Sequence, residues 1–386
     1  MAEAYPLAGV KVLDLTQYVA GPYCTQVLAD LGATVLKVER PQGGDVYRRQ
    51  GPLFLEGESV SFLALNRGKR SIGLDLRDEE DRAALIALAA EADVLVENMK
   101  PGTLARYGLD YEQLSQRAPR LVYCSISGFG QTGPLAAEGA YDLTIQALSG
   151  LMSMTGHPDQ PPAKIPVAAL DFGSALYGVI GIQAALWQRQ QTGRGQWIQA
   201  SLLETSLAWL SMHVAARAAG GEEPRPLGTR SPFFAPYEAY ATADGHIVVV
   251  GTGGSDGWER FCRAIDAPDL RDDERFAENS LRVENAEALR EAIEARLGTQ
   301  PTAHWEEQLR REGVAFAPVQ TLDQVLGSEQ VRALGLVREG SHPVAGAVAE
   351  VGLPITFSGA SATSEQPAPA LDEHGAVGFG EAAGDD

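Results

Sequence analysis

Residues 10–40 read VKVLDLTQYVAGPYCTQVLADLGATVLKVER, and the order of apolar and polar residues in this stretch predicts a strand, a helix and a second strand. Val10–Leu15 and Thr34–Val38 are short β-branched runs that are typical of buried strands. Between them, Pro22–Leu31 predicts a helix, with proline in its first turn and Gly32 directly after its end. Two buried strands joined by a helix predict a parallel pair with the helix packed against it.

The same alternation continues along the chain. Further strands are predicted at Ser71–Leu76, Val94–Glu97 and Leu121–Ser127, and a helix at Glu79–Ala92. This pattern predicts an α/β fold with a Rossmann-like parallel sheet that is covered by helices on both faces. Such sheets bind ligands beyond the carboxyl ends of their strands. Here those ends lead into residues 16–20, 39–40, 98–100 and 127–130.

The chain of 386 residues exceeds the usual size of a single hydrophobic core, which predicts two domains. Residues 1–220 form the first part of a large domain, with a long buried helix predicted from Asp171 to Arg189 and another at Leu203–Ala219. The Gly/Glu/Pro-rich stretch 220–226 is typical of a linker. After it, residues 227–325 predict a smaller α+β domain, with a hairpin at 237–250 and helices near 257–264, 286–297 and 303–312.

The composition argues against several classes of protein. The formal net charge of −20 disfavours general affinity for nucleic acid or an anionic membrane. Without a basic and apolar leader at the N-terminus, and with apolar stretches such as Ile247–Val250 too short to span a bilayer, we expect a cytoplasmic protein. Three widely spaced cysteines, Cys24, Cys124 and Cys262, suit a reducing compartment. The six scattered histidines have no metal-ligand spacing, so no metal site is predicted.

Basic residues are concentrated before position 110 in this acidic chain. Several of them fall where the carboxyl-end crevice of the sheet is expected, which favours a ligand that carries phosphates. For any single one of them, a place on a solvated helix face is an equally good interpretation. The group comprises Lys37, Arg40, Arg48, Arg49, Arg67, Lys69, Arg70, Arg77, Lys100 and Arg106.

Residues 128–133, GFGQTG, match the G-x-G-x-x-G pattern of dinucleotide-binding loops and follow a predicted strand. The context disfavours an NAD site, because Pro134 follows directly and no apolar helix begins inside the motif. The motif is also not in the first strand-to-helix turn. A tight turn that lines a pocket is the better interpretation of these glycines.

Asp171 has an unusual setting, since it follows an apolar run and precedes a long helix without another acid until Glu204. The helix dipole and free amide groups would stabilise an ionised carboxylate there, even one partly removed from water. Aspartate is also a common N-cap, and on composition alone the cap is the favoured interpretation. The two roles are compatible.

Short motifs recur along most of the chain in a characteristic order and spacing. They are LAGVKVLDLT (7–16), AGP (20–22), DLGA (30–33), KVER (37–40), NRGKRS (66–71), VEN (96–98), PG (101–102), GFGQTGP (128–134), AYD (140–142), SGLM (149–152), TGRGQ (192–196) and APY (235–237). In this order they resemble the class III CoA-transferases, also called the formyl-CoA transferase or CaiB/BaiF family.

The resemblance implies that Asp171 is a covalent nucleophile. Its carboxylate attacks an acyl-CoA thioester to give an aspartyl anhydride, then an aspartyl-CoA thioester, from which CoA passes to an acceptor acid. It further implies that residues 326–386 return to the large domain and that two chains interlock as a homodimer with the active site between subunits. The implied contacts to coenzyme A are Gln17, Tyr18, Val19, Ala20, Arg40, Leu74, Arg77, Asn98, Met99, Arg106 and Tyr107.

Two other activities stay open within this resemblance. In α-methylacyl-CoA racemases a catalytic histidine occupies the place of Tyr141, and a tyrosine is a poor base at neutral pH, so transfer is favoured. A silent CoA-binding protein is the third alternative. Val19 stands where formyl-CoA transferases carry glutamine, and their run of four glycines is absent, which disfavours the oxalate/formate branch. Residues 123–134 look closest to members that use succinyl-CoA, and Gly251–Gly257 is either a lid or a structural loop.

Overall fold

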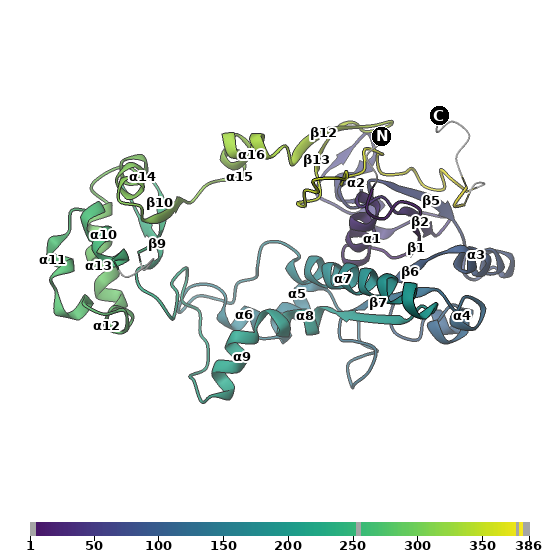
Figure 1. Cartoon of the computed structure of the whole chain (residues 1–386), viewed down its shortest axis with the longest axis horizontal. Helices are drawn as coiled ribbons and strands as arrows, with labels where there is room; N and C mark the ends of the chain where they lie inside the picture. Colours follow the sequence, from purple (N-terminus) through teal and green to yellow (C-terminus); the bar gives the residue numbers. More distant parts are fainter. Residues whose placement is uncertain (1–4, 252–255, 376–377, 381–386) are drawn as a thin grey trace. The chain divides into compact units, whose positions relative to one another are not determined.

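The computed structural model describes residues 5–251, 256–375 and 378–380 (Figure 1). These residues divide into two compact units. The large unit is drawn from Met1–Leu151, Ile165–Glu222 and Glu329–Asp386, and the small unit from Met152–Lys164 and Glu223–Ser328. The chain therefore leaves the large unit and later re-enters it.

A parallel sheet forms the centre of the large unit, which confirms the predicted α/β fold. Six strands in the described part of the chain pair in the order β5-β2-β1-β6-β7-β8, and every pair is parallel. Because the chain order reverses on either side of β1, the topological switch point lies between β1 and β6. The strands are β1 (Lys11–Leu15), β2 (Thr34–Glu39), β5 (Lys69–Gly73), β6 (Val94–Glu97), β7 (Val122–Ser127) and β8 (Trp197–Ser201).

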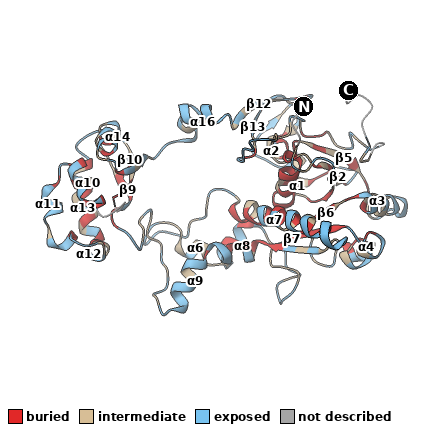
Figure 2. Cartoon of the chain, viewed as in Figure 1, coloured by how far each residue is buried: buried red, intermediate tan, exposed pale blue. Residues whose placement is uncertain are grey.

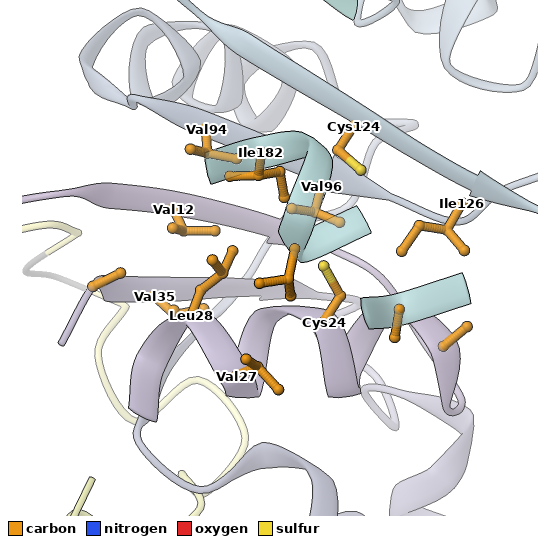
Figure 3. Close-up of a cluster of buried hydrophobic side chains, with 14 of the residues drawn as sticks. Val12, Cys24, Val27, Leu28, Val35, Val94, Val96, Cys124, Ile126 and Ile182 are labelled. Atoms are coloured by element: carbon orange, nitrogen blue, oxygen red, sulfur yellow. The ribbon is translucent and has the colours of Figure 1, made fainter. Parts of the chain in front are cut away.

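Helices cover both faces of this sheet. Successive residues of a strand point to opposite sides, so each strand contributes side chains to two separate hydrophobic clusters. Val12, Val35 and Val96 pack against α1 and α7 (Figure 3). Their neighbours Leu13 and Leu36 pack on the other face, against α3 and α4. The helices of this unit are α1 (Ala20–Asp30), α2 (Val60–Asn66), α3 (Glu79–Glu91), α4 (Tyr111–Arg117), α5 (Asp142–Leu148), α7 (Ala169–Thr192), α8 (Leu202–Trp209), α9 (Ser211–Ala218) and α16 (Glu329–Leu334).

Several smaller elements complete the large unit. They are the 3-10 turns η1 (Val46–Arg49) and η2 (Leu104–Tyr107), the hairpins β3 (Phe54–Leu55) with β4 (Glu58–Ser59) and β12 (Val337–His342) with β13 (Gly346–Val351), and α6 (Leu151–Met154), which straddles the boundary between the units. The prediction of a single helix at 203–219 is wrong, because the helix is interrupted at Leu210, which separates α8 from α9.

α7 is long and apolar enough to cross a membrane by length and composition, and it is the one such helix in the described part of the chain. It packs against α1 and the sheet through Ala175, Val179 and Ile182, and buried and exposed residues alternate along it (Figure 2). A core helix passes the same test, so its length and composition are weak evidence for a membrane span.

Gly178 of α7 marks the closest approach of this helix to the sheet. A Cβ atom at this position would lie 3.2 Å from Cys24 Sγ, 3.2 Å from Ile126 Cδ1 and 3.6 Å from Cys124 Sγ. We expect Gly178→Ala to lower the free energy of unfolding by about 1–3 kcal/mol, measured by urea denaturation, because overpacking outweighs the better helix propensity of alanine. The matched control is Gln190→Ala on an exposed part of α7, expected within about 0.5 kcal/mol of the parent. Unchanged stability of Gly178→Ala would contradict the tight packing.

The small unit contains a three-stranded antiparallel sheet, β11-β10-β9, backed by helices. Its core includes Tyr240, Ile247, Phe261 and Phe276. The predicted hairpin is present, whereas β11 was not predicted. The elements are β9 (Tyr237–Ala241), β10 (His246–Val250), α10 (Gly257–Ala264), α11 (Pro268–Arg271), η3 (Glu274–Phe276), α12 (Asn279–Glu284), α13 (Ala286–Leu297), α14 (Thr302–Arg311), β11 (Ala315–Pro318) and α15 (Leu322–Leu326). Most of the predicted lid, Gly251–Gly257, lies outside the described residues.

The C-terminal residues from 360 onwards are rich in Ser, Ala, Glu and Pro, a composition typical of loose structure, yet residues 363–375 are held by the large unit. This segment, called the C-terminal strap below, runs along α1 and the edge strand β5. His374 N donates to Ser71 O at 2.9 Å, and Gly73 N donates to Asp372 Oδ1 at 2.8 Å. Earlier in the strap, Thr363 N donates to Asp30 O at 2.9 Å. These hydrogen bonds fix a segment whose composition alone resembles a flexible tail.

Candidate active site

A cavity of about 420 Å³ lies at the carboxyl ends of four strands of the large unit. It is lined by the segments that follow β1, β2, β5 and β6, which is where parallel sheets bind ligands. Five of the predicted CoA contacts line it: Gln17, Arg40, Arg77, Met99 and Tyr107. Its wall also includes Asp45, Asp75 and Thr103, which sequence reasoning did not select.

The other predicted contacts lie around this cavity without lining it. Val19, Ala20 and Leu74 are buried side chains, so only their main-chain atoms could face a ligand. Arg106 is exposed on η2. The Asn98 amide is engaged with the main chain of Gln17, accepting from its N–H at 3.0 Å and donating to its carbonyl at 2.7 Å. This pair of hydrogen bonds joins the segments after β1 and β6 at the switch point, so the Asn98 side chain holds the loop after β1 in place.

Only part of the predicted basic patch is available to a ligand. Lys37, Arg67 and Lys69 are buried and paired with Asp45, Asp30 and Asp14, respectively. Arg48 is likewise paired with Glu39. Burial would raise the pKa of Asp14, but the charges of Lys69 and Lys37 outweigh it and lower that pKa to about 2. These cations therefore hold the loops together, and the prediction of a single cationic crevice is wrong for them.

Arg40 and Arg77 are the arginines that line the cavity. Arg77 makes a two-pronged ion pair with Asp75, with Nη2 2.8 Å from Oδ2 and Nε 3.0 Å from Oδ1. Hydrogen bonds from Arg77 lower the pKa of Asp75 to about 2. The Arg77 side chain is 76% exposed, so its guanidinium can be reached by an anion in exchange for part of its contact with Asp75.

Asp171 lies in the first turn of α7, two residues after the helix begins, and is not its cap. The cap comes from Asp142 instead, whose Oδ2 accepts from Leu170 N at 2.7 Å and from Asp171 N at 3.3 Å. Asp142 is buried at the start of α5, where the Gln146 amide donates to its Oδ1. Both the N-cap interpretation of Asp171 and the expected free amides around it are therefore wrong.

The amide groups at the start of α7 donate to Asp142, so they do not stabilise the Asp171 carboxylate. This carboxylate is partly buried and lies near a second negative charge, that of Asp142. Burial, followed by the charge of Asp142, raises the pKa of Asp171 to about 7. Among the described residues, no side chain or amide group donates a hydrogen bond to this carboxylate. A partly dry carboxylate with a raised pKa and few hydrogen bonds is a strong nucleophile once it is ionised.

Three tyrosines gather beside this carboxylate. The ring of Tyr18 lies edge-on to that of Tyr47, with centroids 5.8 Å apart, and edge-on to that of Tyr141 at 6.0 Å. Burial and then the charges of Asp171 and Asp45 raise the pKa of Tyr47, which places its phenol within electrostatic reach of Asp171. Tyr141, directly before Asp142, is 63% exposed. Tyr47 carried no signal in the sequence beyond its place three residues after the Gly43–Gly44 turn.

The features of a dinucleotide site or a metal site are not found at this edge. In the fully described stretch between β7 and α5, Gly130 and Gly133 have φ angles of +90° and +94° and form turns, and no helix begins there. Across residues 5–251, 256–375 and 378–380, no three His, Cys, Asp or Glu side chains form a group that could hold a metal ion.

Comparison with known proteins gives one consistent answer. The profile of CoA-transferase family III matches residues 7–375. A succinyl-CoA:glutarate CoA-transferase of Mus musculus is 39% identical over 96% of this chain and 84% of its own. An acetyl-CoA:oxalate CoA-transferase of Acetobacter aceti is 39% identical over 96% and 94%.

Solved structures agree with this match. A CaiB/BaiF family protein from Brucella suis superposes with a TM-score of 0.86, at 41% identity over 96% of this chain and 97% of the other. The Rv3272 protein from Mycobacterium tuberculosis gives 0.88, at 30% identity over 98% and 100%. The predicted family is thus confirmed: the chain belongs to CoA-transferase family III and is a CoA-transferase that acts on CoA thioesters.

Proposed function

We propose that this enzyme moves CoA from succinyl-CoA to a small dicarboxylic acid through covalent intermediates on Asp171. The observation that carries the proposal is the setting of the Asp171 carboxylate, which is partly buried, has a pKa raised to about 7 and lies within electrostatic reach of Tyr47 in the tyrosine cluster. Relatives named for glutarate, mesaconate and oxalate all take dicarboxylic acids, and several are named for succinyl-CoA.

The chemistry balances in four steps. Asp171 attacks the thioester carbonyl, so that an aspartyl-acyl anhydride forms and CoA leaves as a thiolate. The thiolate then attacks the aspartyl carbonyl, which releases the donor acid together with one aspartate oxygen and leaves an aspartyl-CoA thioester. The acceptor carboxylate attacks this thioester to form a new anhydride and free thiolate. Attack of the thiolate on the acceptor carbonyl gives the product and restores the Asp171 carboxylate. Water must be excluded throughout, or the anhydride hydrolyses.

We further propose that the nucleotide part of CoA enters the cavity at the switch point. The guanidinium groups of Arg40 and Arg77 are suited to its phosphates, since Arg binds phosphate oxygens bidentately. Gln17, Tyr18, Met99, Arg106 and Tyr107 lie in or beside this cavity, and Val19, Ala20 and Leu74 contribute main-chain atoms. Tyr141 directly precedes Asp142, which holds the first turn of α7, and its ring packs edge-on against Tyr18, so we propose it as a catalytic residue of the site.

An oxygen-transfer experiment tests the proposal. With an acceptor acid labelled with ¹⁸O in its carboxylate, one labelled oxygen remains on Asp171 after each turnover, because it was the bridging atom of the second anhydride. We expect the peptide that contains Asp171 to gain one ¹⁸O by mass spectrometry after a single turnover with succinyl-CoA and labelled glutarate, and up to two after many turnovers. The control omits succinyl-CoA and leaves this peptide unlabelled. Complete turnover without label on Asp171 would exclude the aspartyl route.

The racemase and the silent CoA-binding protein are distinguished from a transferase by a second assay, in D₂O with a 2-methylacyl-CoA. A racemase exchanges the α-proton of a 2-methylacyl-CoA with D₂O and produces no new thioester. Tyr141 is at the place of the base that this reaction needs, and its phenol is poorly suited to that role. A silent CoA-binding protein gives neither product nor deuterium exchange. Screening glutarate, oxalate, mesaconate and citramalate as acceptors then identifies the acid that is used.

We also propose a homodimer in the cytoplasm, with domains at 1–220 and 227–325 and the segment 326–386 returning to the first. Apolar side chains stay exposed along α7, α8 and α9, including Ile180, Trp187, Leu207 and Met212. A second copy of this chain is the partner we expect to cover them, because an exposed apolar face of this extent is unusual for a monomer. Analytical ultracentrifugation should give the mass of two chains, and Ile180→Glu should shift it towards one chain.

The raised pKa of Asp171 predicts a pH dependence for the first half-reaction. Attack requires the ionised carboxylate, so kcat/KM for succinyl-CoA should rise about tenfold per pH unit below the pKa of about 7 and level off above it. Stopped-flow measurement of CoA release between pH 5 and pH 9 checks this. A limb centred near pH 4, where an ordinary aspartate titrates, would contradict it.

A further inference from the structure

Asp45 lies at the point where two loops of the active site meet. Its Oδ1 accepts hydrogen bonds from Tyr18 N at 3.2 Å and from Tyr47 N at 3.0 Å. Its Oδ2 lies 3.0 Å from Lys37 Nζ as an ion pair, in an orientation outside hydrogen-bond geometry, and both side chains are fully buried. One carboxylate thus joins the loop after β1 to the 3-10 turn η1 that follows β2.

The loop after β1 has little freedom, because protein side chains occupy its main-chain polar groups. Lys37 Nζ donates to Thr16 O at 2.8 Å. Both residues of the ion pair therefore bind this loop, Lys37 at Thr16 and Asp45 at Tyr18. Asn98 binds both polar groups of Gln17, and Asp45 accepts from Tyr18. Tyr18 has a φ angle of +67°, in the left-handed region that bulky side chains avoid. Such a backbone persists where the surroundings over-determine it, and this occurs mostly at functional sites.

The strained residue carries the central ring of the tyrosine cluster. Tyr18 lies between Tyr47 and Tyr141, edge-on to both. The main chains of two of these three tyrosines are therefore bound to the same carboxylate oxygen, while the third is held by Thr144, whose hydroxyl accepts from Tyr141 N at 2.9 Å. A shift of Asp45 would move Tyr18 and Tyr47 together, relative to Tyr141 and the nucleophile.

We infer that Asp45, paired with Lys37, is the positioning residue of the active site. Asp45 belongs to the cavity wall, but its side chain is fully buried and both of its oxygens are engaged by Tyr18 N, Tyr47 N and Lys37 Nζ. It fixes the rings of Tyr18 and Tyr47 in the site and so sets the rate of the covalent steps rather than the affinity for CoA. This inference rests on the proposed function. A buried ion pair that served stability alone would change the unfolding temperature without a separate effect on kcat.

Steady-state kinetics of the full-length enzyme with succinyl-CoA and glutarate test the inference. Asp45→Asn keeps an oxygen that accepts from both amide groups, so we expect its kcat within about threefold of the parent. Asp45→Ala loses both hydrogen bonds, and a shift of the order of an ångström is expected to cost about 100-fold in kcat with KM for succinyl-CoA changed less than about threefold.

Asp30 provides the matched control. Asp30 is also buried, its Oδ2 lies 2.6 Å from Arg67 Nη2, and its Oδ1 accepts a hydrogen bond from Ser364 N at 2.9 Å. It lies at the C-terminal end of α1, whereas the loop after β1 leads into the N-terminal end of this helix. Asp30→Ala should lower the unfolding temperature as Asp45→Ala does, with kcat within about twofold of the parent. Equal losses of kcat in the two alanine variants, or a loss in Asp45→Ala that appears in KM, would overturn the inference.

If Asp45→Ala does not fold, the milder Asp45→Ser replaces it. This variant is then combined with Tyr18→Ala in a double-mutant cycle. In a Tyr18→Ala background, replacement of Asp45 should lose most of its effect on kcat, because the ring that it positions is gone. Independent, multiplicative effects would overturn the inference. Exchange of labelled succinate by the parent enzyme is measured first, so that absence of this activity counts against the proposed function and not against the role of Asp45.

Discussion

Asp171→Asn is expected to abolish CoA transfer while leaving CoA bound. Loss of the nucleophile removes the covalent route altogether, so the exchange of labelled succinate with succinyl-CoA should fall by about 10⁴-fold or more. The cavity that we assign to the nucleotide does not include Asp171, so the Kd for CoA, measured by calorimetry, should stay within about threefold of the parent.

The same substitution is expected to stabilise the protein at alkaline pH. The pKa of Asp171 is raised from 3.8 to about 7, so the folded state binds more protons than the unfolded state between these values. Stability therefore falls as the pH rises through this window, and the full penalty is present above pH 7. Asparagine carries no such charge, so the variant should gain on the order of 3 kcal/mol over the parent at pH 8 and little at pH 4.

Asp171→Ala is the control for both results, because an asparagine can deamidate and restore activity. Residual exchange in the alanine variant, at more than a trace of the parent rate, would show that another group reacts with the thioester. Equal stability of the parent and the asparagine variant at pH 8 would show that Asp171 has an ordinary pKa.

Asp142→Asn is expected to shift the pH dependence of the reaction and to lower its maximal rate. The carboxylate of Asp142 holds the first turn of α7 through Leu170 N and Asp171 N, and its charge raises the pKa of Asp171. An amide oxygen still accepts these hydrogen bonds but carries no charge. The acidic limb of kcat/KM should therefore move to lower pH by about one unit, and the maximal rate should fall about tenfold because the nucleophile is weaker and less well placed.

Asp142→Ala extends this test, since it also removes the hydrogen bonds, and a loss of about 100-fold in maximal rate is expected. The matched control is Asp110→Ala, which removes the carboxylate that accepts from Gln113 N at the start of α4. That variant should lose about 1 kcal/mol of stability and keep the parent pH profile. An unshifted profile in Asp142→Asn would mean that burial alone raises the pKa of Asp171.

The central sheet was predictable because its strands are buried on both faces. Runs such as Val10–Leu15 and Val94–Glu97 are rich in valine and leucine, and their strand character is local information. β11 was missed because it is only four residues long and pairs with β10, more than sixty residues earlier in the chain. The β12–β13 hairpin was missed because its strands are largely exposed and lack a buried apolar run. The break at Leu210 has no proline or glycine to mark it.

The site was predictable only in part, and the limits are physical. Charge counting identified the basic residues but not their partners, and whether Lys37 meets a ligand or Asp45 is decided by the packing of β2 against the turn that follows it. Local composition favoured Asp171 as a helix cap, yet the cap is Asp142, which lies 29 residues earlier in the chain. The proposal of Asp171 as the nucleophile came from family resemblance, whereas the raised pKa of this residue follows from the fold.

The C-terminal strap has a consequence for the order in which this protein can fold as it is synthesised. β5 is an edge strand, and the hydrogen bonds that cover Ser71 and Gly73 come from Asp372 and His374, some three hundred residues later. The ribosome therefore makes the whole of the small unit before it makes the segment that closes this edge. Until then the nascent chain exposes unpaired amide groups, which can pair with another chain. Demand for chaperones during translation should therefore centre on this open edge, and it should end when the strap emerges.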